Sequence, residues 1–432
     1  MKHSRKLGLL ALVASTYAMV SGGPFGLEEI VGHNGYSRTI LILCLTPLVW
    51  ALPTTLMVSE LASAMPETGG FYVWVRRAMG PFWGFQESWL TFLGSVFDMA
   101  VYPILFAAYL GHLLPALGEG HWPLVLGVAM ISVCVVMNLF GAGFVGRGSI
   151  FFVLLLLAPF AFLVWLAMNA PHAAAVHPHV TRSDLMGGIL IAMWNYMGWD
   201  NASTIAGEVE NARKTYTRAM AISVAVVVAS YLLPIAAAWR ANVPQQAWET
   251  GSWVNIAALF GGQRLAALMT AAGMLAAFST FNALVMSLSR LPYAMARDGY
   301  LPKIFARENQ AGAPWVAIVV CSVLWGLAMG LGFERTVILD VLLTGLSILL
   351  EFVALIMLRR REPNLPRPFR VPFGGVGLAL VSVPPTVLII ISCVRSRSEQ
   401  IGPVSALMVG VVLIALGVVG YYAGPGRKQV SR

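Results

Sequence analysis

The sequence predicts an all-α integral membrane protein, and two observations support that prediction. Of the 432 residues, 58% are hydrophobic and 11% are charged, less than half of the roughly 25% charged share of an average soluble domain. The mean hydropathy is +0.77, and a single globular core of this length has no room for so much apolar surface. Several apolar segments must therefore face lipid, which also excludes a disordered chain.

Twelve apolar segments, separated by short polar loops, supply the expected membrane-spanning helices. A helix needs about 20 mostly apolar residues to cross the hydrocarbon core of a bilayer. In chain order the segments are 7–33, 39–64, 81–113, 122–141, 149–169, 184–209, 218–240, 263–289, 314–332, 336–358, 374–394 and 402–423. Loops this short leave no room for a soluble domain.

The Lys and Arg residues indicate how these spans are oriented. If the N-terminus lies in the cytoplasm, seven of the 28 basic residues fall on the outer side and 21 on the inner side, as the positive-inside rule predicts. The seven are Arg38, Arg182, Arg240, Arg264, Arg335, Arg395 and Arg397. We therefore expect a multi-pass protein of the cytoplasmic membrane with both termini inside. Because the net charge of +9 then encodes topology, we expect no nucleic-acid partner.

Two of the twelve spans are interrupted in their middle. The first contains Ser-Gly-Gly-Pro-Phe-Gly at 21–26, where three glycines and a proline cannot continue an ordinary helix. The sixth contains Trp-Asn-Tyr-Met-Gly-Trp-Asp-Asn at 194–201, a polar and aromatic island in an apolar helix. Broken helices at membrane depth are tolerated only where the freed backbone groups line a cavity or are buried in protein. The two breaks therefore mark a site.

The positions of the breaks also predict the domain organisation. Five helices separate equivalent breaks, so we expect an inverted repeat formed by residues 1–169 and 184–358. Residues 1–358 would then form a transport core of ten helices. Residues 359–432 would add two peripheral helices and a short cytoplasmic tail.

The chemistry of the breaks suits an amino compound. Pro24 is placed like the first residue of an outer half-helix, where its missing N–H has no consequence. Backbone amides left free at the positive end of that half-helix would receive a carboxylate or another acceptor. These are the amides of Gly22, Gly23, Phe25 and Gly26. In the sixth span, the carbonyls of residues 191–194 end a half-helix and would accept from an amine.

Three acidic residues at membrane depth sharpen this expectation: Asp98 in span three, Asp200 in the second break and Glu351 in span ten. An unpaired charge at the bilayer centre costs roughly 2.5 to 3.5 kcal/mol on insertion scales, so none should face lipid. No Lys or Arg stands at mid-depth to neutralise them. The missing partner is then a cationic substrate, a proton, or both. Aromatic rings of the second break would add cation–π contacts, namely those of Trp194, Tyr196 and Trp199.

Each acid also has a purely structural interpretation. Asp200 is placed to cap the second half-helix by accepting the N–H of residue 202 or 203. Asp98 lies one turn before a Tyr-Pro pair and would form a hydrogen bond near the proline kink. Glu351 lies two turns before Arg359, so an ion pair between them competes with a substrate contact. Glu28 follows the first break within a turn, where a role in an outer vestibule competes with simple exposure.

Several motifs resemble those of the amino acid-polyamine-organocation (APC) transporters. Ser-Glu-Leu-Ala at 59–62 and Pro-Glu-Thr-Gly-Gly-Phe-Tyr at 66–72 are similar to the span-two signature of that superfamily. Val-Ser-Gly-Gly-Pro-Phe-Gly-Leu-Glu at 20–28 resembles span one of its polyamine-uptake branch. The same branch is echoed at 97–103 and in the sixth span up to 211. The resemblance extends over nearly the whole chain.

The resemblance implies a LeuT-type fold with a five-plus-five inverted repeat, alternating access, a substrate between broken helices one and six, and proton coupling. Combined with the break residues, it gives the expected substrate site: Ser21, Gly22, Gly23, Gly26, Asp98, Tyr102, Trp194, Asn195, Gly198, Asp200 and Glu351. Asp98, Asp200 and Glu351 would also exchange protons. The chain departs from the family at Ala158 and Pro159, where some proton-coupled members carry a lysine. Ser279 and Thr280 offer an alternative, a sodium site.

The predicted function is a secondary active transporter of a polyamine or similar organic cation, coupled to protons. An amino acid permease of the same superfamily, working as a symporter or an exchanger, is the alternative. A sensor or a channel that uses the same cavity is a rival from another class, but the short loops hold no effector domain. We expect no enzyme, because no nucleophile and base share a depth, and no metal or cofactor.

Overall fold

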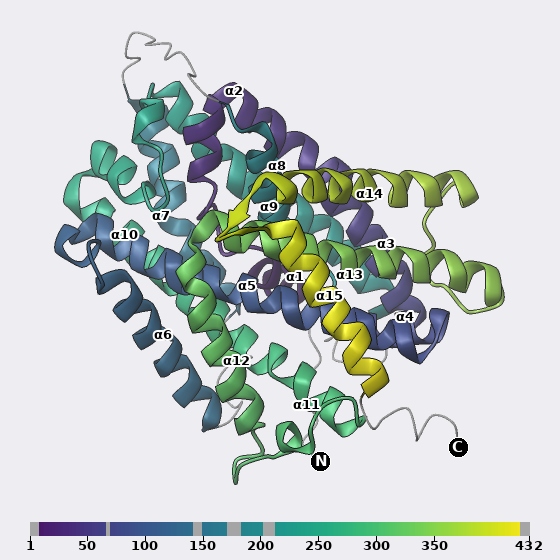
Figure 1. Cartoon of the computed structure of the whole chain (residues 1–432). Helices are drawn as coiled ribbons and strands as arrows, with labels where there is room; N and C mark the ends of the chain where they lie inside the picture. The colour runs from purple at the N-terminus through teal and green to yellow at the C-terminus, as the bar shows by residue number, and fades with distance from the viewer. Residues whose placement is uncertain (1–7, 66–69, 141–148, 171–182, 202–211, 424–432) are drawn as a thin grey trace.

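The structure is a computed structural model in which residues 8–65, 70–140, 149–170, 183–201 and 212–423 are described. It is a bundle of helices with one short hairpin (Figure 1). Its α-helices are α1 (Leu9–Val20), α2 (Glu28–Thr46), α3 (Leu52–Ala64), α4 (Gly70–Met79), α5 (Pro81–Leu113), α6 (Trp122–Leu139), α7 (Ser149–Asn169), α8 (Leu185–Asn195), α9 (Ala212–Arg240), α10 (Trp253–Leu288), α11 (Arg290–Arg297), α12 (Trp315–Ala328), α13 (Phe333–Arg361), α14 (Gly374–Ser398) and α15 (Ala406–Ala423).

Shorter elements join these helices. A π-helical turn, η1 (Pro47–Ala51), connects α2 to α3 without a break. Single 3₁₀ turns are η2 (Pro115–Leu117), η4 (Gln245–Ala247), η5 (Lys303–Ala306) and η6 (Met329–Leu331). The antiparallel strands β1 (Gln400–Ile401) and β2 (Val404–Ser405) form the hairpin before α15. The expected last span therefore begins at Ala406 and not at 402, because residues 400–405 form this hairpin.

Helices cover most of the described parts of the expected apolar segments. Eight stretches, some of them helices joined end to end, are long and apolar enough to cross a membrane, and three shorter apolar helices accompany them within the described residues. Residues 81–113 begin and end as expected. The first two expected spans meet inside α2, where Gly35 has φ 71° and ψ 169°, values that interrupt the helix and that glycine adopts without strain. Expected features at 66–69 and 202–211 lie outside the described residues.

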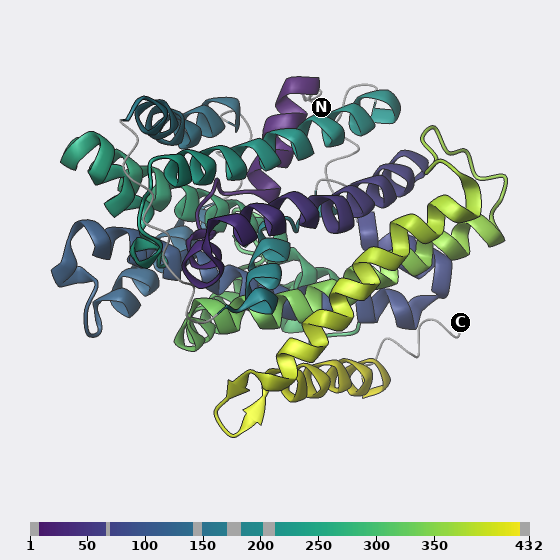
Figure 2. The same ribbon diagram turned by 90° about the horizontal axis from the view of Figure 1, so that it is seen from above.

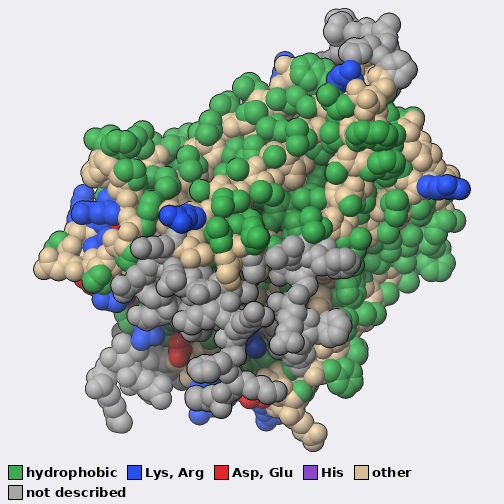
Figure 3. All heavy atoms as spheres, turned by 180° about the vertical axis from the view of Figure 1, so that it is seen from behind, with side chains coloured by type: hydrophobic (Ala, Val, Ile, Leu, Met, Phe, Trp, Pro, Cys, Tyr) green, Lys and Arg blue, Asp and Glu red, His purple; other side chains and the backbone are tan. Residues whose placement is uncertain are grey.

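The surface of the bundle is suited to lipid. Large hydrophobic side chains remain exposed on several helices, among them Leu154, Leu268 and Leu380. Figure 3 shows a face whose upper part is largely hydrophobic, with Lys and Arg side chains mostly at its sides and in its lower part. A soluble monomer rarely exposes a continuous apolar surface of this kind.

Two helices form the centre of the bundle. α5 and α13 pack against each other along much of their lengths, and α10 packs against α5 on another side. α5 crosses the middle of the molecule in Figure 1. Figure 2 shows α15 at the edge of the bundle, beside the end of α14. α5 and α13 run in opposite directions. The end of α13 lies beside the start of α5, because Arg361 donates to the carbonyl of Ala78. The start of α13 lies at the other end of the bundle, where Glu334 meets Arg395 of α14.

The two ends of the bundle are named after the arginines that organise them. The Arg359 end holds the start of α5 and the end of α13, because Arg361 donates to the carbonyl of Ala78 just before α5. The Arg395 end holds the start of α13, the start of α8 and the end of α14.

Candidate substrate-binding site

A cavity lies between the two broken helices, α5, α10 and α13. Its volume is about 90 Å³. Seven of the expected site residues line it: Gly22, Asp98, Tyr102, Trp194, Asn195, Gly198 and Asp200. The expected residues Ser21, Gly23, Gly26 and Glu351 do not belong to the lining.

The wall that α5 contributes is one stripe of the helix. Its residues follow each other by three or four positions, the spacing of one helical face: Thr91, Ser95, Asp98, Tyr102, Leu105 and Tyr109. From the first to the last, this stripe spans about 27 Å at 1.5 Å per residue. Because the small volume of the cavity extends along this stripe, the cavity is a long and narrow slot.

The first broken helix is unwound where the sequence predicts it. α1 ends at Val20, and the next helical residue is Glu28. Gly23 and Gly26 have φ values of 92° and 87°, which favour glycine. Pro24 was expected to begin the second half-helix, but it does not. The irregular segment continues for three more residues, and the helix begins at Glu28. The carbonyl of Pro24 accepts a hydrogen bond from the indole of Trp253 at 2.9 Å.

The two breaks are joined by a hydroxyl network. The Tyr231 hydroxyl on α9 donates to the carbonyl of Asn195 at 2.7 Å and is hydrogen bonded to the hydroxyl of Ser21 at 2.8 Å. Ser21 in turn accepts the amide of Gly23 at 3.1 Å. The expectation of a free amide at Gly23 is therefore wrong. Ser21 and Gly23 support the cavity from behind its wall.

The second break has a similar outcome. α8 ends at Asn195, and Gly198 has φ 89°. A side chain at Gly198 would meet the carbonyl of Met19 at 2.9 Å, so the two breaks approach each other closely. The expected free carbonyls at 191–194 each accept an internal hydrogen bond instead, because the chain turns back on them.

Asp98 is the best-placed acid for a cation. Its Oδ1 accepts the indole N–H of Trp194 at 3.0 Å and a longer contact from the hydroxyl of Tyr102 at 3.4 Å. The expected hydrogen bond near the proline kink thus exists, but the carboxylate also lines the cavity. Trp194 lies beside Gly26, where a Cβ would come within 3.1 Å of its ring. The absent side chain at Gly26 makes room for Trp194.

Asp200 lines the cavity nearer the Arg359 end. Its side chain is 6% exposed, and Oδ1 has no hydrogen-bond partner among the described residues. The helix-cap interpretation of Asp200 involves residues 202 and 203, which lie outside the described part. Of the three aromatics expected to contact a cation, Trp194 lines the cavity. Tyr196 and Trp199 are fully buried, and their polar atoms bond to backbone carbonyls, so they serve packing.

Asp340 is an acid of the cavity that the sequence analysis missed. It lies on α13 and accepts the hydroxyl of Thr344 at 2.7 Å, and it faces Asp98 of α5, since its Oδ1 is 3.2 Å from the place of a Cβ at Gly94, one turn before Asp98. It lies near the start of the expected tenth span, so its depth in the membrane did not mark it as a site residue. A useful signal would have been its spacing from Glu351, since eleven residues return to the same helical face.

Glu351 occupies a different place from the one expected. It is fully buried, outside the lining of the cavity, and neither carboxylate oxygen has a hydrogen-bond partner among the described residues. The alternative interpretation, an ion pair with Arg359, is also wrong. Eight residues along a helix separate the two by about 12 Å, and Arg359 binds Glu60 of α3 instead.

Aromatic side chains close the cavity toward the Arg395 end. Phe25 packs edge-on against Tyr109 and Phe160, and Phe160 packs against Trp253. Behind this cluster, the hydroxyl of Tyr109 donates to the fully buried carboxylate of Glu28 at 2.5 Å. Glu28 is therefore neither exposed nor part of an open vestibule.

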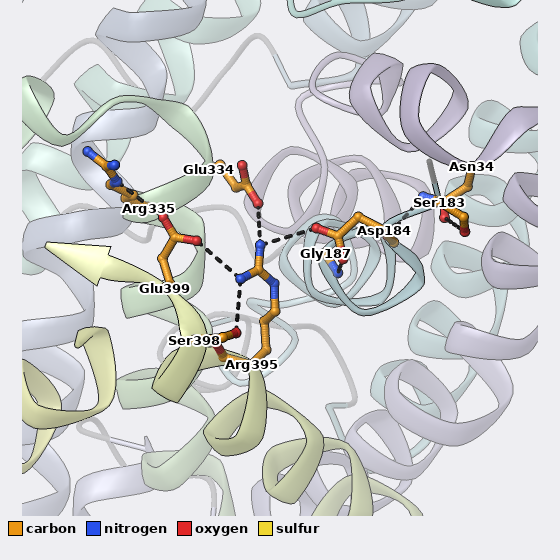
Figure 4. Close-up of polar contacts among 9 residues, drawn as sticks. All are labelled: Asn34, Ser183, Asp184, Gly187, Glu334, Arg335, Arg395, Ser398 and Glu399. Carbon is orange, nitrogen blue, oxygen red and sulfur yellow. Dashed lines mark hydrogen bonds and ion pairs between the residues drawn. The ribbon is translucent and has the colours of Figure 1, made fainter. Parts of the chain in front are cut away.

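An arginine network holds the Arg395 end together (Figure 4). Arg395 bonds to Asp184 at 3.1 Å, to Glu334 at 2.9 Å and to Glu399 at 3.1 Å. Asp184 caps α8 by accepting the amide of Gly187 at 2.9 Å. The network therefore joins α8, α13 and α14, two of which contribute walls to the cavity.

A second network holds the Arg359 end. The carboxylate of Glu60 is fully buried and accepts from the guanidinium of Arg359 and from the amide of Val371 at 2.7 Å. Arg367 lies 3.3 Å from the same carboxylate. Burial lowers the pKa of Arg367, and the neighbouring carboxylate opposes that shift. Glu60 thus ties α3 to α13 and to the loop before α14.

Charge is distributed unevenly in the cavity. Its described lining carries Asp98, Asp200 and Asp340 and contains no Lys, Arg or His. Thr280 of the expected sodium site lines the cavity, whereas Ser279 does not. Three carboxylates without a protein cation require protons or bound cations to remain in a low-dielectric site.

Comparison with known proteins identifies the family. A family model described as amino acid permease matches residues 12–417. The chain belongs to this amino acid permease family. Like other members, it is therefore a helical integral membrane protein for transmembrane transport, as the sequence analysis predicted.

Relatives within this permease family carry more specific names. A polyamine transporter of Arabidopsis thaliana is 34% identical over 99% of this chain and 86% of its own length. A polyamine transporter of Oryza sativa subsp. japonica is 35% identical over 95% of this chain and 78% of its own length. A serine/threonine exchanger of Bacillus subtilis is 23% identical over 85% of this chain and 86% of its own length.

Proposed function

We propose that this permease is a secondary transporter that moves a linear polyamine across the cytoplasmic membrane by alternating access. The observation that carries the proposal is the composition of the cavity, with three aspartates and no basic side chain in its described lining. The names of the plant relatives support the same substrate class.

The electrostatics favour a substrate with more than one positive charge. An ammonium about 4 Å from a carboxylate gains roughly 4 kcal/mol at an effective dielectric constant near 20, enough to offset the burial of one acid. Asp98 and Asp340 face each other, and Asp200 stands apart toward the Arg359 end. Amines separated along a chain would neutralise acids separated along the slot. The ring of Trp194 would add a cation–π contact of about 0.5 to 2 kcal/mol.

The shape of the cavity supports a linear solute. The slot follows one stripe of α5, from Thr91 to Tyr109. A polyamine is a chain of methylenes and amines, and it presents its charges along its length. Leu105, Leu284 and Ala277 supply apolar lining for the methylenes.

An amino acid is the second candidate, and one relative favours it. The serine/threonine exchanger covers most of the chain at lower identity. An amino acid brings a carboxylate, which needs amide or cationic donors. Gly22 and Phe25 line the cavity and would supply amides, but the three aspartates oppose a second negative charge.

We extend the proposal to the topology and to the coupling ion. The Arg359 end, which carries Arg77, Arg359, Arg361 and Arg367, would face the cytoplasm. The twelve segments would form a LeuT-type inverted repeat of residues 1–169 and 184–358, with 359–432 at the periphery. Protons would drive uptake, since buried acids without cations can carry them. A sodium site at Thr280 remains the competing hypothesis for coupling.

Uptake into proteoliposomes tests the substrate. We expect labelled putrescine and spermidine to enter and to exchange with unlabelled polyamine preloaded inside. Arginine and neutral amino acids, supplied at the same concentration, should enter far more slowly, and protein-free liposomes give the background. Entry of neutral amino acids alone would remove the polyamine assignment. Entry without exchange would indicate a channel, and binding without entry a sensor.

A further inference from the structure

A second pair of acids lies off the cavity, toward the Arg359 end. Glu87 on α5 is fully buried, and its Oε1 accepts from the hydroxyls of Thr91 at 2.9 Å and Ser347 at 3.0 Å. These two hydroxyls are 2.8 Å apart. Glu351 follows Ser347 by one turn of α13 and is also fully buried, with both carboxylate oxygens unpartnered among the described residues. No expected function included Glu87.

The antiparallel register of α5 and α13 brings the two glutamates together. Moving along α5, Thr91 meets Ser347, the backbone of Gly94 meets Thr344, and Asp98 faces Asp340. Each step toward the end of α5 therefore corresponds to an equal number of residues toward the start of α13. One turn before Thr91, the same register places Glu87 opposite Glu351. The electrostatic influence of Glu87 on Glu351 agrees with this placement.

The charges around this pair are negative. Asp200 acts on both glutamates from the cavity. Other charged groups of the described elements packed against this part of α5 and α13 have partners elsewhere or are exposed, as Arg290 and Arg360 are, and α8 and α14 place theirs at the Arg395 end. The partnered groups are Glu60 with Arg359, Arg77 with Glu362, Arg76 with Tyr72, and Arg297 with the Tyr293 ring. Two adjacent buried carboxylates without a cation cannot both stay ionised.

We propose that Glu87 and Glu351 together form the proton site of this permease, separate from the aspartates that bind the substrate. Three hydroxyls from Thr91, Ser347 and Ser88 donate toward Glu87, so a negative charge is best accommodated there. Glu351 has no such donor and holds the proton. This assignment rests on the proposed transport function and names the groups that couple it to protons.

Thr91 connects the proton site to the cavity. Its side chain lines the cavity and donates a hydrogen bond to Glu87. The Thr91 hydroxyl therefore links the substrate cavity to the carboxylate of the proton site. On one side of the membrane, a hydronium ion gives up a proton and becomes water, and the proton forms an O–H bond on the pair. After the conformational change, that bond breaks and the proton passes to water on the other side. No oxidant or further reactant is needed.

Two assays on proteoliposomes separate coupling from transport. Counterflow of labelled putrescine at equal pH on both sides measures substrate exchange. Accumulation driven by a pH gradient, with the membrane potential clamped to zero, measures coupling. One proton per substrate gives about tenfold accumulation for each pH unit. Failure of wild-type counterflow would defeat the transport function itself, whereas failure of wild-type accumulation with intact counterflow would defeat the proton site alone.

The decisive variants are Glu351→Gln and Glu87→Gln, which keep size but cannot release a proton. We expect both to retain counterflow within about threefold and to lose the roughly tenfold accumulation. The counterflow of Glu351→Gln should also become independent of pH. Glu119→Gln, which changes an exposed acid, should behave as wild type. Normal gradient-driven accumulation by Glu351→Gln would overturn the proposal.

A milder variant keeps the test valid if a glutamine variant does not fold. Ser347→Ala removes one donor to Glu87 and leaves both acids in place. The ionised pair is then less stable, so the protonated state persists to higher pH. The fall of gradient-driven uptake with rising pH should shift to higher pH. An unchanged pH profile in this variant would assign Ser347 and the pair to packing.

Discussion

Replacing Asp98 by asparagine removes one negative charge from the cavity and nearly preserves the size of the side chain. Asp98 has two donors, Trp194 and Tyr102, whereas Asp340 has one, Thr344. Because donors stabilise a carboxylate, the ionised member of the facing pair is expected to be Asp98. The substrate ammonium should therefore bind most strongly to Asp98.

The size of the effect follows from two estimates. An ammonium 4 Å from a carboxylate at an effective dielectric constant near 20 gains about 4 kcal/mol, which sets an upper limit of about 1,000-fold in affinity. A charged hydrogen bond contributes about 1.5 to 3 kcal/mol net, or roughly 10-fold to 150-fold. We expect Asp98→Asn to weaken putrescine binding within this second range, because Asp200 and Asp340 retain part of the field.

Equilibrium binding of labelled putrescine to purified protein in detergent measures this prediction. Asp340→Asn is the matched comparison, because it changes an acid of the same cavity with fewer donors, and its effect should be smaller. Melting temperatures of the two variants check that each remains folded. Equal affinity of Asp98→Asn and wild type, or a larger loss in Asp340→Asn, would refute the argument from donor number.

Three further substitutions test other parts of the structure. Glu60→Gln should lower the free energy of unfolding by about 3 kcal/mol in a thermal or denaturant assay, because its arginine partners lose a buried carboxylate; the same change at the more exposed Glu362 should cost less than about 1 kcal/mol. Arg395→Gln should destabilise the protein by about 2 kcal/mol at low salt, with a smaller difference at high salt if the network is partly screened. Gly94→Ala would place a Cβ 2.1 Å from the Thr344 hydroxyl and should abolish putrescine binding even though the substituted position carries no charge.

The backbone of the site was largely predictable from the sequence. Both breaks lie where glycine, proline and polar residues interrupt apolar segments, because helix propensity and membrane burial act locally. Pro24 was misplaced because the irregular segment runs on to Leu27, with Gly26 at positive φ. A sequence can predict that a helix is broken, but the length of the unwound segment depends on the side chains packed against it, here Trp253 and Trp194.

The partners of the acids were not predictable, because they are decided between helices. An ion pair of Arg359 with Glu351 on the same helix was one of two interpretations, whereas the actual partner of Arg359, Glu60, lies almost 300 positions earlier in the chain. Asp340 gained its importance by facing Asp98 across the contact between α13 and α5. Depth along a span can be estimated from sequence, whereas the face toward which a side chain points requires the register between helices.

That register gives the acids their arrangement. Asp98 and Glu87 are eleven residues apart on α5, and Asp340 and Glu351 are eleven residues apart on α13. Eleven residues make just over three turns, about 16 Å of rise, so each helix presents both of its acids on one face. The contact between α5 and α13 therefore produces two pairs of carboxyl groups. Asp98 and Asp340 line the cavity, whereas Glu87 and Glu351 lie outside it. A solute that cannot reach the second pair can still be coupled to it, because any movement of α5 against α13 changes both pairs together.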